Sequence, residues 1–379
     1  MHTFATAARW ADFFMTESER VAEAIAAFKR GEIVVVTDDD DRENEGDLIL
    51  AAVHATPEKL AFFVRHTTGI VCAPLTREAA RRLQLQPMVA DNDAPLGTAF
   101  TVSVDVRHGL TTGISAEERS NTVRGLANGN IGAADFVRPG HVFPLIAKDG
   151  GVLMRSGHTE AAIDLCRLAG LELVGVLAEL VNDDGTVKRG GDVARFAVEH
   201  GLRTVSVADL IAHRQRSERL VERVAEFPII THAGPARAYA YRTPFDATQH
   251  LAVVFGDIGD GKRVPARLHR EAVIDDVFGE KSGLDRVMVR LAEGGRGIVV
   301  YLREGSVGVA ESSSRARDGI GERGDSSAAR REEWREIGLG AQILRDLGVK
   351  SIVHIASRER RYVGLDGFGI VIEETETPE

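Results

Sequence analysis

Apolar residues in the first half of the chain switch repeatedly between helical spacing and short continuous runs. Between Ser18 and Phe28 they recur every three or four positions, and Gly31 ends that pattern. A β-branched run from Ile33 to Val36 follows, which predicts a buried strand directly after the helix. The alternation continues to about Ser206 and is typical of a mixed sheet packed with helices. We therefore expect an α/β domain of the α+β type.

Further segments of the first half fit this alternation. We predict strands at Leu48–Val53, Gly69–Cys72 and Phe100–Val106, and helices at Pro57–Val64 and Ala161–Leu171. In addition, Ser115 and Glu118 have the spacing of a capping box, in which each side chain accepts a hydrogen bond from the other residue's backbone N–H. Another helix is therefore expected to begin there.

A charged helical stretch, Val207–Glu226, is predicted to connect this domain to a second one. The chain has 379 residues, and roughly 150 residues per domain favours two domains. We place the boundary near Arg219, which gives domains 1–219 and 220–379. Each is expected to be a mixed β-sheet packed with helices.

The second half opens with strand-like segments at Ala238–Tyr241 and Leu251–Phe255. The helical pattern VMVRLAEGG and the strand pattern GIVVYL follow. Residues 310–331 have Ile320 as their only large apolar side chain, so this stretch is predicted to be a mobile loop. A helix through Leu344 and a last strand pair ending at Glu374 complete the pattern.

Composition disfavours several classes of protein. The 47 basic and 57 acidic side chains give 47 − 57 = −10, a net charge that repels nucleic acid and anionic membrane surfaces. The two cysteines, Cys72 and Cys166, cannot form a disulfide framework and fit a reducing compartment. The sequence also has no export signal and no apolar run of eighteen residues. We expect a cytoplasmic protein without nucleic-acid or membrane partners.

The acidic segment Asp38–Asp47 directly follows the first predicted strand. If the chain stays extended there, Glu43, Glu45 and Asp47 share one face, and Gly46 permits close approach of the backbone. Clustered carboxylates raise one another's proton affinity and bind hard divalent cations such as magnesium. The alternative interpretation is a solvated acidic turn.

Two further segments combine glycine with histidine. Gly140–Leu145 predicts a turn that exposes His141, and a purely structural turn is the alternative. Arg155–Glu160 leads into a helix, where free N–H groups and the helix dipole favour a phosphate. His158 in that segment could ligate a metal ion beside the phosphate. A simple N-cap by Thr159 would explain part of the pattern.

Together these segments resemble 3,4-dihydroxy-2-butanone 4-phosphate synthase, an enzyme of riboflavin biosynthesis. The motifs that carry the resemblance lie between about Glu17 and His213 and are DDDDRENEGDLILAA, HTTGIVC, TAFTVSVD, TTGISAEER, RPGHVFPL and GGVLMRSGHTEAAIDLCRLAGLELVGVLAE. The resemblance implies a lyase that converts ribulose 5-phosphate to dihydroxybutanone phosphate plus formate, with two magnesium or manganese ions. It also implies a homodimer with sites at the subunit interface.

The resemblance assigns roles to individual residues. Glu43 would bridge both metal ions and His158 would ligate one of them, so both would also contact the substrate. The sugar phosphate would be bound by Arg42, Asp47, Thr112, Arg155, Ser156, Gly157, Thr159 and Glu179. Catalysis would depend on His141, Glu179, Glu45 and Cys72. For Cys72, packing at the end of an apolar strand is the alternative.

The second half resembles GTP cyclohydrolase II, through FPIITHAG, HLAVVFGDIGDGKRVPARLHREAVIDDVFG, AEGGRGIVVYLREG and IGLGAQILRDLGVKSI. That family holds a catalytic zinc ion with three cysteines. Here Ala272 follows His269-Arg-Glu, and the residues after Gly279 include no cysteine. We therefore expect neither zinc nor GTP cyclohydrolase II activity. The alternatives are a nucleotide-binding regulatory or dimer-stabilising module, or a zinc site rescued by His232, His250 and His269.

Overall fold

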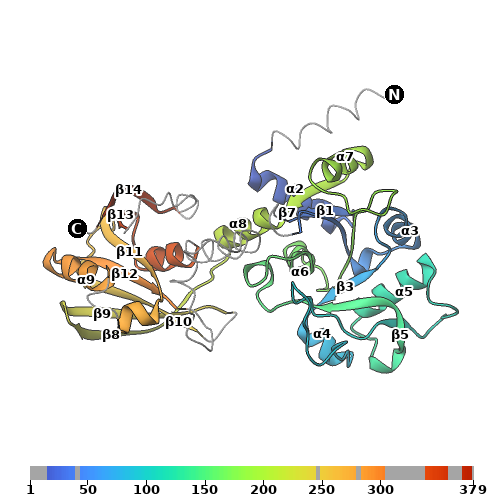
Figure 1. Cartoon of the computed structure of the whole chain (residues 1–379), viewed down its shortest axis with the longest axis horizontal. Helices are drawn as coiled ribbons and strands as arrows, with labels where there is room; N and C mark the ends of the chain where they lie inside the picture. The colour runs from blue at the N-terminus through green and yellow to red at the C-terminus, as the bar shows by residue number, and fades with distance from the viewer. Residues whose placement is uncertain are drawn as a thin grey trace. The chain divides into compact units, whose positions relative to one another are not determined.

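The computed structural model describes residues 15–38, 43–244, 248–278, 283–303, 338–356 and 369–377. The chain divides into two compact units, unit 1 (Met1–His213) and unit 2 (Arg214–Glu379) (Figure 1). Each contains a mixed seven-stranded sheet packed with helices, which confirms the predicted fold class. The boundary expected near Arg219 lies just beyond α8 (Val207–Ser217). No described helix is both long and apolar enough to cross a membrane.

Unit 1 alternates helices and strands as the apolar pattern predicts. Its helices before α8 are α2 (Glu17–Lys29), η2 (Ala52–His54), α3 (Pro57–His66), α4 (Arg77–Arg82), α5 (Ala116–Ala127), η3 (Ala133–Asp135), η4 (Gly151–Leu153), α6 (His158–Ala169) and α7 (Gly191–His200). Its strands are β1 (Val34–Thr37), β2 (Gly46–Ala51), β3 (Cys72–Leu75), β4 (Val104–Val106), β5 (Phe136–Ile146), β6 (Gly175–Glu179) and β7 (Arg203–Ser206). The capping box of Ser115 and Glu118 forms and begins α5.

The sheet of unit 1 has the strand order β4-β5-β3-β6-β2-β1-β7 and a core on each face. Successive residues of β2 point to opposite faces. Leu48 and Leu50 join the core that contains side chains of α3 and α5. Ile49 and Ala51 join the core that contains side chains of α2 and α6. The sheet is thus the middle layer between two layers of helices (Figure 1).

Unit 2 is built around a sheet with the order β14-β13-β11-β12-β10-β9-β8. Its labelled elements are β8 (Glu222–Thr231), β9 (Gly234–Arg242), β10 (Gln249–Gly256), β11 (Val264–Arg270), η5 (Ile274–Phe278), α9 (Gly283–Glu293), β12 (Arg296–Leu302), β13 (Ser351–Ile355) and β14 (Val371–Glu376). Val287 and Leu291 of α9 pack with Val299 of β12. Residues 338–346 form another helix, and Gly340 brings it against Leu268 of β11.

Some predicted elements differ from the structure. The helix predicted for Val207–Glu226 ends at Ser217, and its last residues belong to β8. This edge strand is exposed along most of its length, so it lacks the apolar alternation that indicates a strand. In Phe100–Val106 only β4 is a regular strand, and β3 begins at Cys72, after the left-handed turn at Gly69. The predicted mobile loop 310–331 lies outside the described residues.

Candidate active site and metal centre

Several of the predicted functional side chains gather at one edge of the unit 1 sheet. Asp47, near the start of β2, pairs in register with Glu179 at the end of β6. Also on β6, Leu177 pairs with Cys72 of β3, which in turn pairs with Phe143 of β5. Residues two apart in a strand share a face. Asp47, Glu179 and Cys72 therefore lie on the sheet face that α6 covers.

The acidic loop between β1 and β2 folds around the carboxylate of Asp38. Its Oδ2 accepts the Glu43 N–H at 3.2 Å, and its Oδ1 accepts the Glu45 N–H at 3.0 Å. Between them, Asn44 has a φ of 52°, a left-handed conformation that asparagine tolerates. The sequence did not single out Asp38, because a run of four aspartates does not show which one turns inward.

His158, the first residue of α6, faces this loop. Its Nδ1 lies 3.5 Å from Oε2 of Glu43 and 3.8 Å from Oδ2 of Asp47. One ligand atom each from Asp38, Glu43 and His158 lie within 4.8 Å of one another.

Two atoms of this group indicate what it can hold. Nε2 of His158 and Oδ1 of Asp47 are buried and accept or donate no hydrogen bond within the described residues. Buried polar atoms are rarely left without a partner. Carboxylates and an imidazole are suitable ligands for magnesium or manganese ions. The residues present therefore fit a divalent cation.

The same groups shift one another's pKa. Burial raises the pKa of Asp47 to about 7, although the nearby His158 opposes this shift. Burial disfavours the charged form of His158, but Asp47 and Glu43 outweigh that effect and raise its pKa to about 9. In the metal-free protein the imidazole is therefore protonated at neutral pH. A metal ion that binds His158 has to displace this proton.

The turn before α6 presents backbone donors. Gly157 is the N-cap residue, and no side chain caps the helix. The first N–H groups of α6 therefore remain available to an anion at the positive end of the helix dipole. Thr159 is the second helical residue, so the alternative that it is the N-cap is wrong. Ser156 and Thr159 are both buried in this turn.

His141 belongs to a second group, on β4 and β5. Its Nδ1 lies 2.7 Å from Oδ2 of Asp105, and its backbone N–H donates to Oδ1 at 2.9 Å. Asp105 is almost fully buried, whereas the His141 side chain is 42% exposed. A Cβ at Gly113 would lie 2.1 Å from Asp105 Oδ2, so this contact requires glycine. Within the described residues, no hydrogen bond or ion pair joins His141 to Glu43 or His158.

Comparison with known proteins places this geometry in a family. Residues 22–213 match the model of 3,4-dihydroxy-2-butanone 4-phosphate synthase. Residues 222–377 match the model of GTP cyclohydrolase II. The riboflavin biosynthesis protein RibBA of Salinispora arenicola is 46% identical over 372 residues, which cover 94% of this chain and 88% of that protein. The chain belongs to the 3,4-dihydroxy-2-butanone 4-phosphate synthase family.

Other similar proteins show what accompanies this domain. The bifunctional riboflavin biosynthesis protein RIBA 1 of Arabidopsis thaliana is 45% identical, over 93% of this chain and 67% of that protein. RibBX of A. baumannii, described as a two-domain synthase, has a TM-score of 0.80 and 37% identity, covering 94% and 99% of the two chains. A synthase in complex with two magnesium ions has a TM-score of 0.51 and 47% identity, covering 52% and 97%. The expected class, a metal-dependent lyase, is thereby confirmed.

Glu179 and Cys72 lie near Asp47 on neighbouring strands. The Glu179 carboxylate accepts the Thr68 hydroxyl at 2.7 Å. Burial, with the charges of Glu179 and Asp47, raises the pKa of the Cys72 thiol well above its usual range. The thiol therefore stays protonated and packs in the core beneath the two carboxylates.

Two further predicted residues, Glu45 and Thr112, lie in flanking loops. Glu45 accepts a hydrogen bond from Arg189 at 3.3 Å, and burial raises its pKa. The Thr112 hydroxyl lies 3.4 Å from Oε2 of Glu118, so the cap of α5 also holds this threonine. Arg42 lies outside the described residues.

In unit 2, the turn that follows β11 is held by a carboxylate. Asp276 accepts the Ala272 N–H at 2.9 Å and the Tyr301 hydroxyl at 2.7 Å, and it lies 2.9 Å from His269 Nε2. The other two candidate histidines have separate surroundings. His232 lies 3.5 Å from Asp285, and His250 Nδ1 accepts the Arg303 N–H at 3.1 Å. In the described part of unit 2, no three such ligands come close enough to share an ion.

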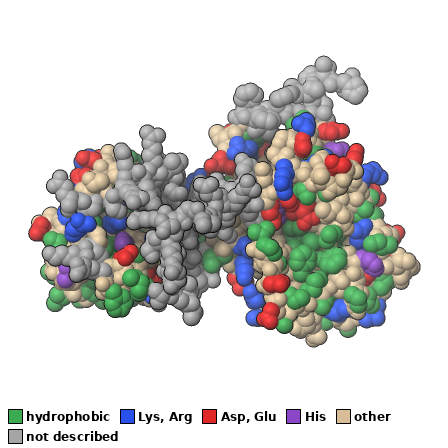
Figure 2. All heavy atoms as spheres, viewed as in Figure 1, with side chains coloured by type: hydrophobic (Ala, Val, Ile, Leu, Met, Phe, Trp, Pro, Cys, Tyr) green, Lys and Arg blue, Asp and Glu red, His purple; other side chains and the backbone are tan. Residues whose placement is uncertain are grey.

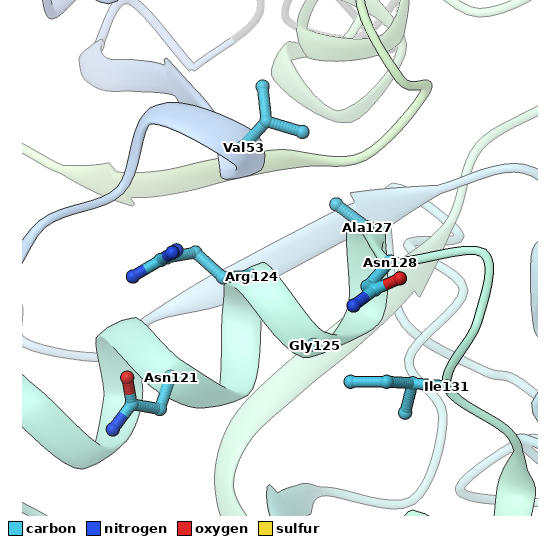
Figure 3. Close-up of a pocket in the computed structure, with 7 residues that line it drawn as sticks. All are labelled: Val53, Asn121, Arg124, Gly125, Ala127, Asn128 and Ile131. Carbon is cyan, nitrogen blue, oxygen red and sulfur yellow. The ribbon is translucent and has the colours of Figure 1, made fainter.

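A pocket of about 430 Å³ lies beside α5, away from the residues discussed above (Figure 3). Asn121, Arg124 and Asn128 provide its polar lining, and Val53 and Ile131 contribute apolar walls. It contains none of the site residues predicted from the sequence. The core side chains of α5 belong to the sheet face opposite α6, so this pocket is separate from the metal centre.

Proposed function

We propose that unit 1 converts D-ribulose 5-phosphate to 3,4-dihydroxy-2-butanone 4-phosphate plus formate. The observation that supports this function is the position of His158. It stands beside Glu43 and Asp47 and is also the first residue of a helix with uncapped N–H groups. Metal ligands and a phosphate anchor are therefore adjacent. The reaction requires no oxidant, because the atoms of one ketose phosphate equal those of the two products.

Glu43 and His158 would hold the metal ions, and Asp38 is close enough to join them. When bound, magnesium or manganese ions act as Lewis acids that stabilise the charge of an enediolate. Asp47 and Glu179 face the same region from adjacent strands, where their carboxylates can move protons on the substrate carbons. Glu45 would support this acid–base work.

His141 would transfer a second proton. Asp105 fixes its Nδ1, so Nε2 is the ring atom left for the substrate. The phosphate would be bound by the N–H groups at the start of α6, with Ser156, Gly157 and Thr159 around it, and Arg42, Thr112 and Arg155 would complete the binding site. Such an anchor, remote from the reacting carbons, fixes a flexible sugar in one geometry.

We propose that a second copy of the chain completes each site, as the family resemblance implies. Ile70, Leu96 and Ile114 are between 43% and 53% exposed. Each lies in a loop that contains a predicted site residue or bonds to one. Ile70 lies two residues after Thr68, which bonds to Glu179, and the Leu96 carbonyl accepts from Arg155. Ile114 lies two residues after Thr112. Figure 2 shows hydrophobic side chains gathered on one face of unit 1. The molar mass in solution tests this proposal.

Unit 2 is proposed to lack GTP cyclohydrolase II activity. The observation behind this is that Ala272 stands where a thiolate is needed, and that the described residues of unit 2 bring no three metal ligands together. A nucleotide-binding regulatory role or a dimer-stabilising role remains the alternative function of this unit. A cytoplasmic setting also belongs to the proposal, because both cysteines are free thiols.

The test of the synthase function is formate release. Purified protein supplied with magnesium and ribulose 5-phosphate should produce formate, whereas a sample treated with a chelator should not. Equal formate in both samples, or none in either, would reject the assignment.

A further inference from the structure

Resting on the proposed function, we infer that Glu160 is a positioning residue for phosphate recognition. Its buried carboxylate braces Arg155 and thereby fixes the turn that begins α6. Sequence patterns did not single out Glu160, and Arg155 was expected to be a direct phosphate ligand. The contacts of the two side chains indicate instead that Arg155 mainly holds the turn in place, while the backbone N–H groups of α6 face the phosphate.

Glu160 lies in the first turn of α6 and is 1% exposed. A glutamate at this position of a helix often bonds back to the N-cap N–H. Here no side chain caps Gly157. Instead, one oxygen of Glu160 accepts the Lys148 N–H at 3.0 Å, and the other accepts Nη1 of Arg155 at 2.7 Å. The carboxylate therefore holds both ends of the segment 148–155 that precedes the helix.

Most N–H groups of the Arg155 guanidinium donate hydrogen bonds within this network. Its Nε and Nη2 donate to the Leu96 carbonyl at 3.3 and 3.2 Å, and Nη2 also donates to Thr98 Oγ1 at 3.0 Å. With the bond to Glu160, four of the five N–H groups of a guanidinium are engaged. Counting contacts with the described residues, one N–H group remains for a ligand, so Arg155 cannot bind a phosphate bidentately in this conformation.

The contact between Glu160 and Arg155, called the brace here, links three segments around the proposed phosphate site: residues 96–98, residues 148–155 and the start of α6. Arg155 joins the 96–98 turn to the start of α6, and its guanidinium passes close to Gly157, where a Cβ would lie 2.4 Å from Nη1. Glu160 keeps the guanidinium in this place. The backbone N–H groups of α6 then face the ligand without being blocked by an acidic cap. Loss of the brace is expected to weaken phosphate binding more than the chemical step.

The test uses the full chain with Glu160→Gln. Glutamine has one acceptor oxygen for the two N–H donors of Lys148 and Arg155, so one of the two hydrogen bonds is lost. The NH2 group of the new side chain then faces an N–H donor. We expect the KM for ribulose 5-phosphate and the Kd for inorganic phosphate, followed by ³¹P NMR, to rise at least about tenfold, with kcat within about threefold. Phosphate binding needs no turnover, so the brace is tested even if formate release fails.

The same experiment separates the brace from a role of Glu160 in charge neutralisation. If Glu160 only neutralised a phosphate-binding Arg155, its replacement would tighten phosphate binding, and that result or an unchanged Kd overturns the proposal. Asp209→Asn is the matched control, because it breaks another partly buried pair, with Arg20 at 3.1 Å, and should leave the Kd unchanged. If Glu160→Gln does not fold, Thr98→Val removes the other end of the brace and should raise the Kd in the same direction.

Discussion

At the scale of single residues, the charge of the candidate metal centre depends on the proximity of Asp47 to His158. Burial alone would keep both side chains neutral. Their proximity, with Nδ1 of His158 3.8 Å from Asp47, instead keeps the imidazole charged in the metal-free protein. The acidic cluster thus holds positive charge in place before a metal ion arrives.

This coupling predicts how magnesium binding depends on pH. The folded-state pKa of His158 is raised to about 9, so below that pH the metal ion must expel a proton. Affinity should therefore rise between pH 7 and 9, by about tenfold per unit when one proton is released. Calorimetry in buffers of different ionisation enthalpy measures the protons released. Affinity that is independent of pH would contradict the prediction, and Asp47→Asn should move the rise to lower pH.

Replacing individual ligands tests the same centre. Glu43→Gln removes a charge at nearly constant volume, and His158→Ala removes the imidazole. Each should lower the rate of formate release by at least about 10²-fold, the low end for a positioned catalytic group. Glu172→Gln, at an exposed position after α6, is the control and should retain the wild-type rate. Near-normal turnover in either ligand variant would show that the metal centre is elsewhere.

At the scale of elements, the pairing of β4 with β5 determines what His141 can do. Asp105 lies on β4 and reaches both the ring and the backbone of His141. Asp105 is the polar residue of β4, and its partner lies 36 residues further on. A sequence without its tertiary pairing cannot show this contact.

Asp105→Asn is expected to reduce catalysis without loss of substrate binding. The amide oxygen of asparagine can still accept the backbone N–H of His141. The amide nitrogen, however, would donate to ring Nδ1 and so favour the tautomer that carries its proton on Nε2. We expect kcat to fall at least about 10²-fold with little change in KM, and the pH–rate profile to shift. Ser103→Ala is the matched control, because Ser103 bonds Gly140 on the same pair of strands. A kcat loss of equal size in this control would indicate a general defect of this strand pair.

The sequence grouped candidate residues where they are close along the chain. Period-two spacing in an extended chain predicted one face for Glu43, Glu45 and Asp47, and the segment Arg155–Glu160 indicated His158. The left-handed Asn44 interrupts the extended chain, and Glu45 bonds to Arg189. The contact of Asp47 with Glu179 depends on strands 132 residues apart, and only the family resemblance brought Glu179 into the site. The network of Glu160 was likewise missed, because a glutamate in a first helical turn usually indicates a cap.

At the scale of the whole molecule, the two units differ in the polar side chains that lie at the ends of their strands. In unit 1 the strand ends present carboxylates around a histidine with a buried, unpartnered nitrogen. In unit 2, after β11, Asp276 accepts hydrogen bonds from Ala272 and Tyr301 and lies 2.9 Å from His269 Nε2. Similarity to a bifunctional relative therefore extends over the fold of unit 2, while its described residues hold no group of metal ligands.

We accordingly expect that this protein does not open the imidazole ring of GTP. That chemistry requires a tightly held zinc ion to activate water, and such sites use thiolate ligands at about 2.3 Å. Both cysteines of the chain lie in unit 1 and are buried there. His232, His250 and His269 have separate surroundings, and in the described part of unit 2 no three such ligands come close enough to share an ion. Elemental analysis should find less than one zinc ion per chain, and incubation with GTP and magnesium should yield no diaminopyrimidine product. One zinc ion per chain together with that product would show that unit 2 retains the activity through other ligands.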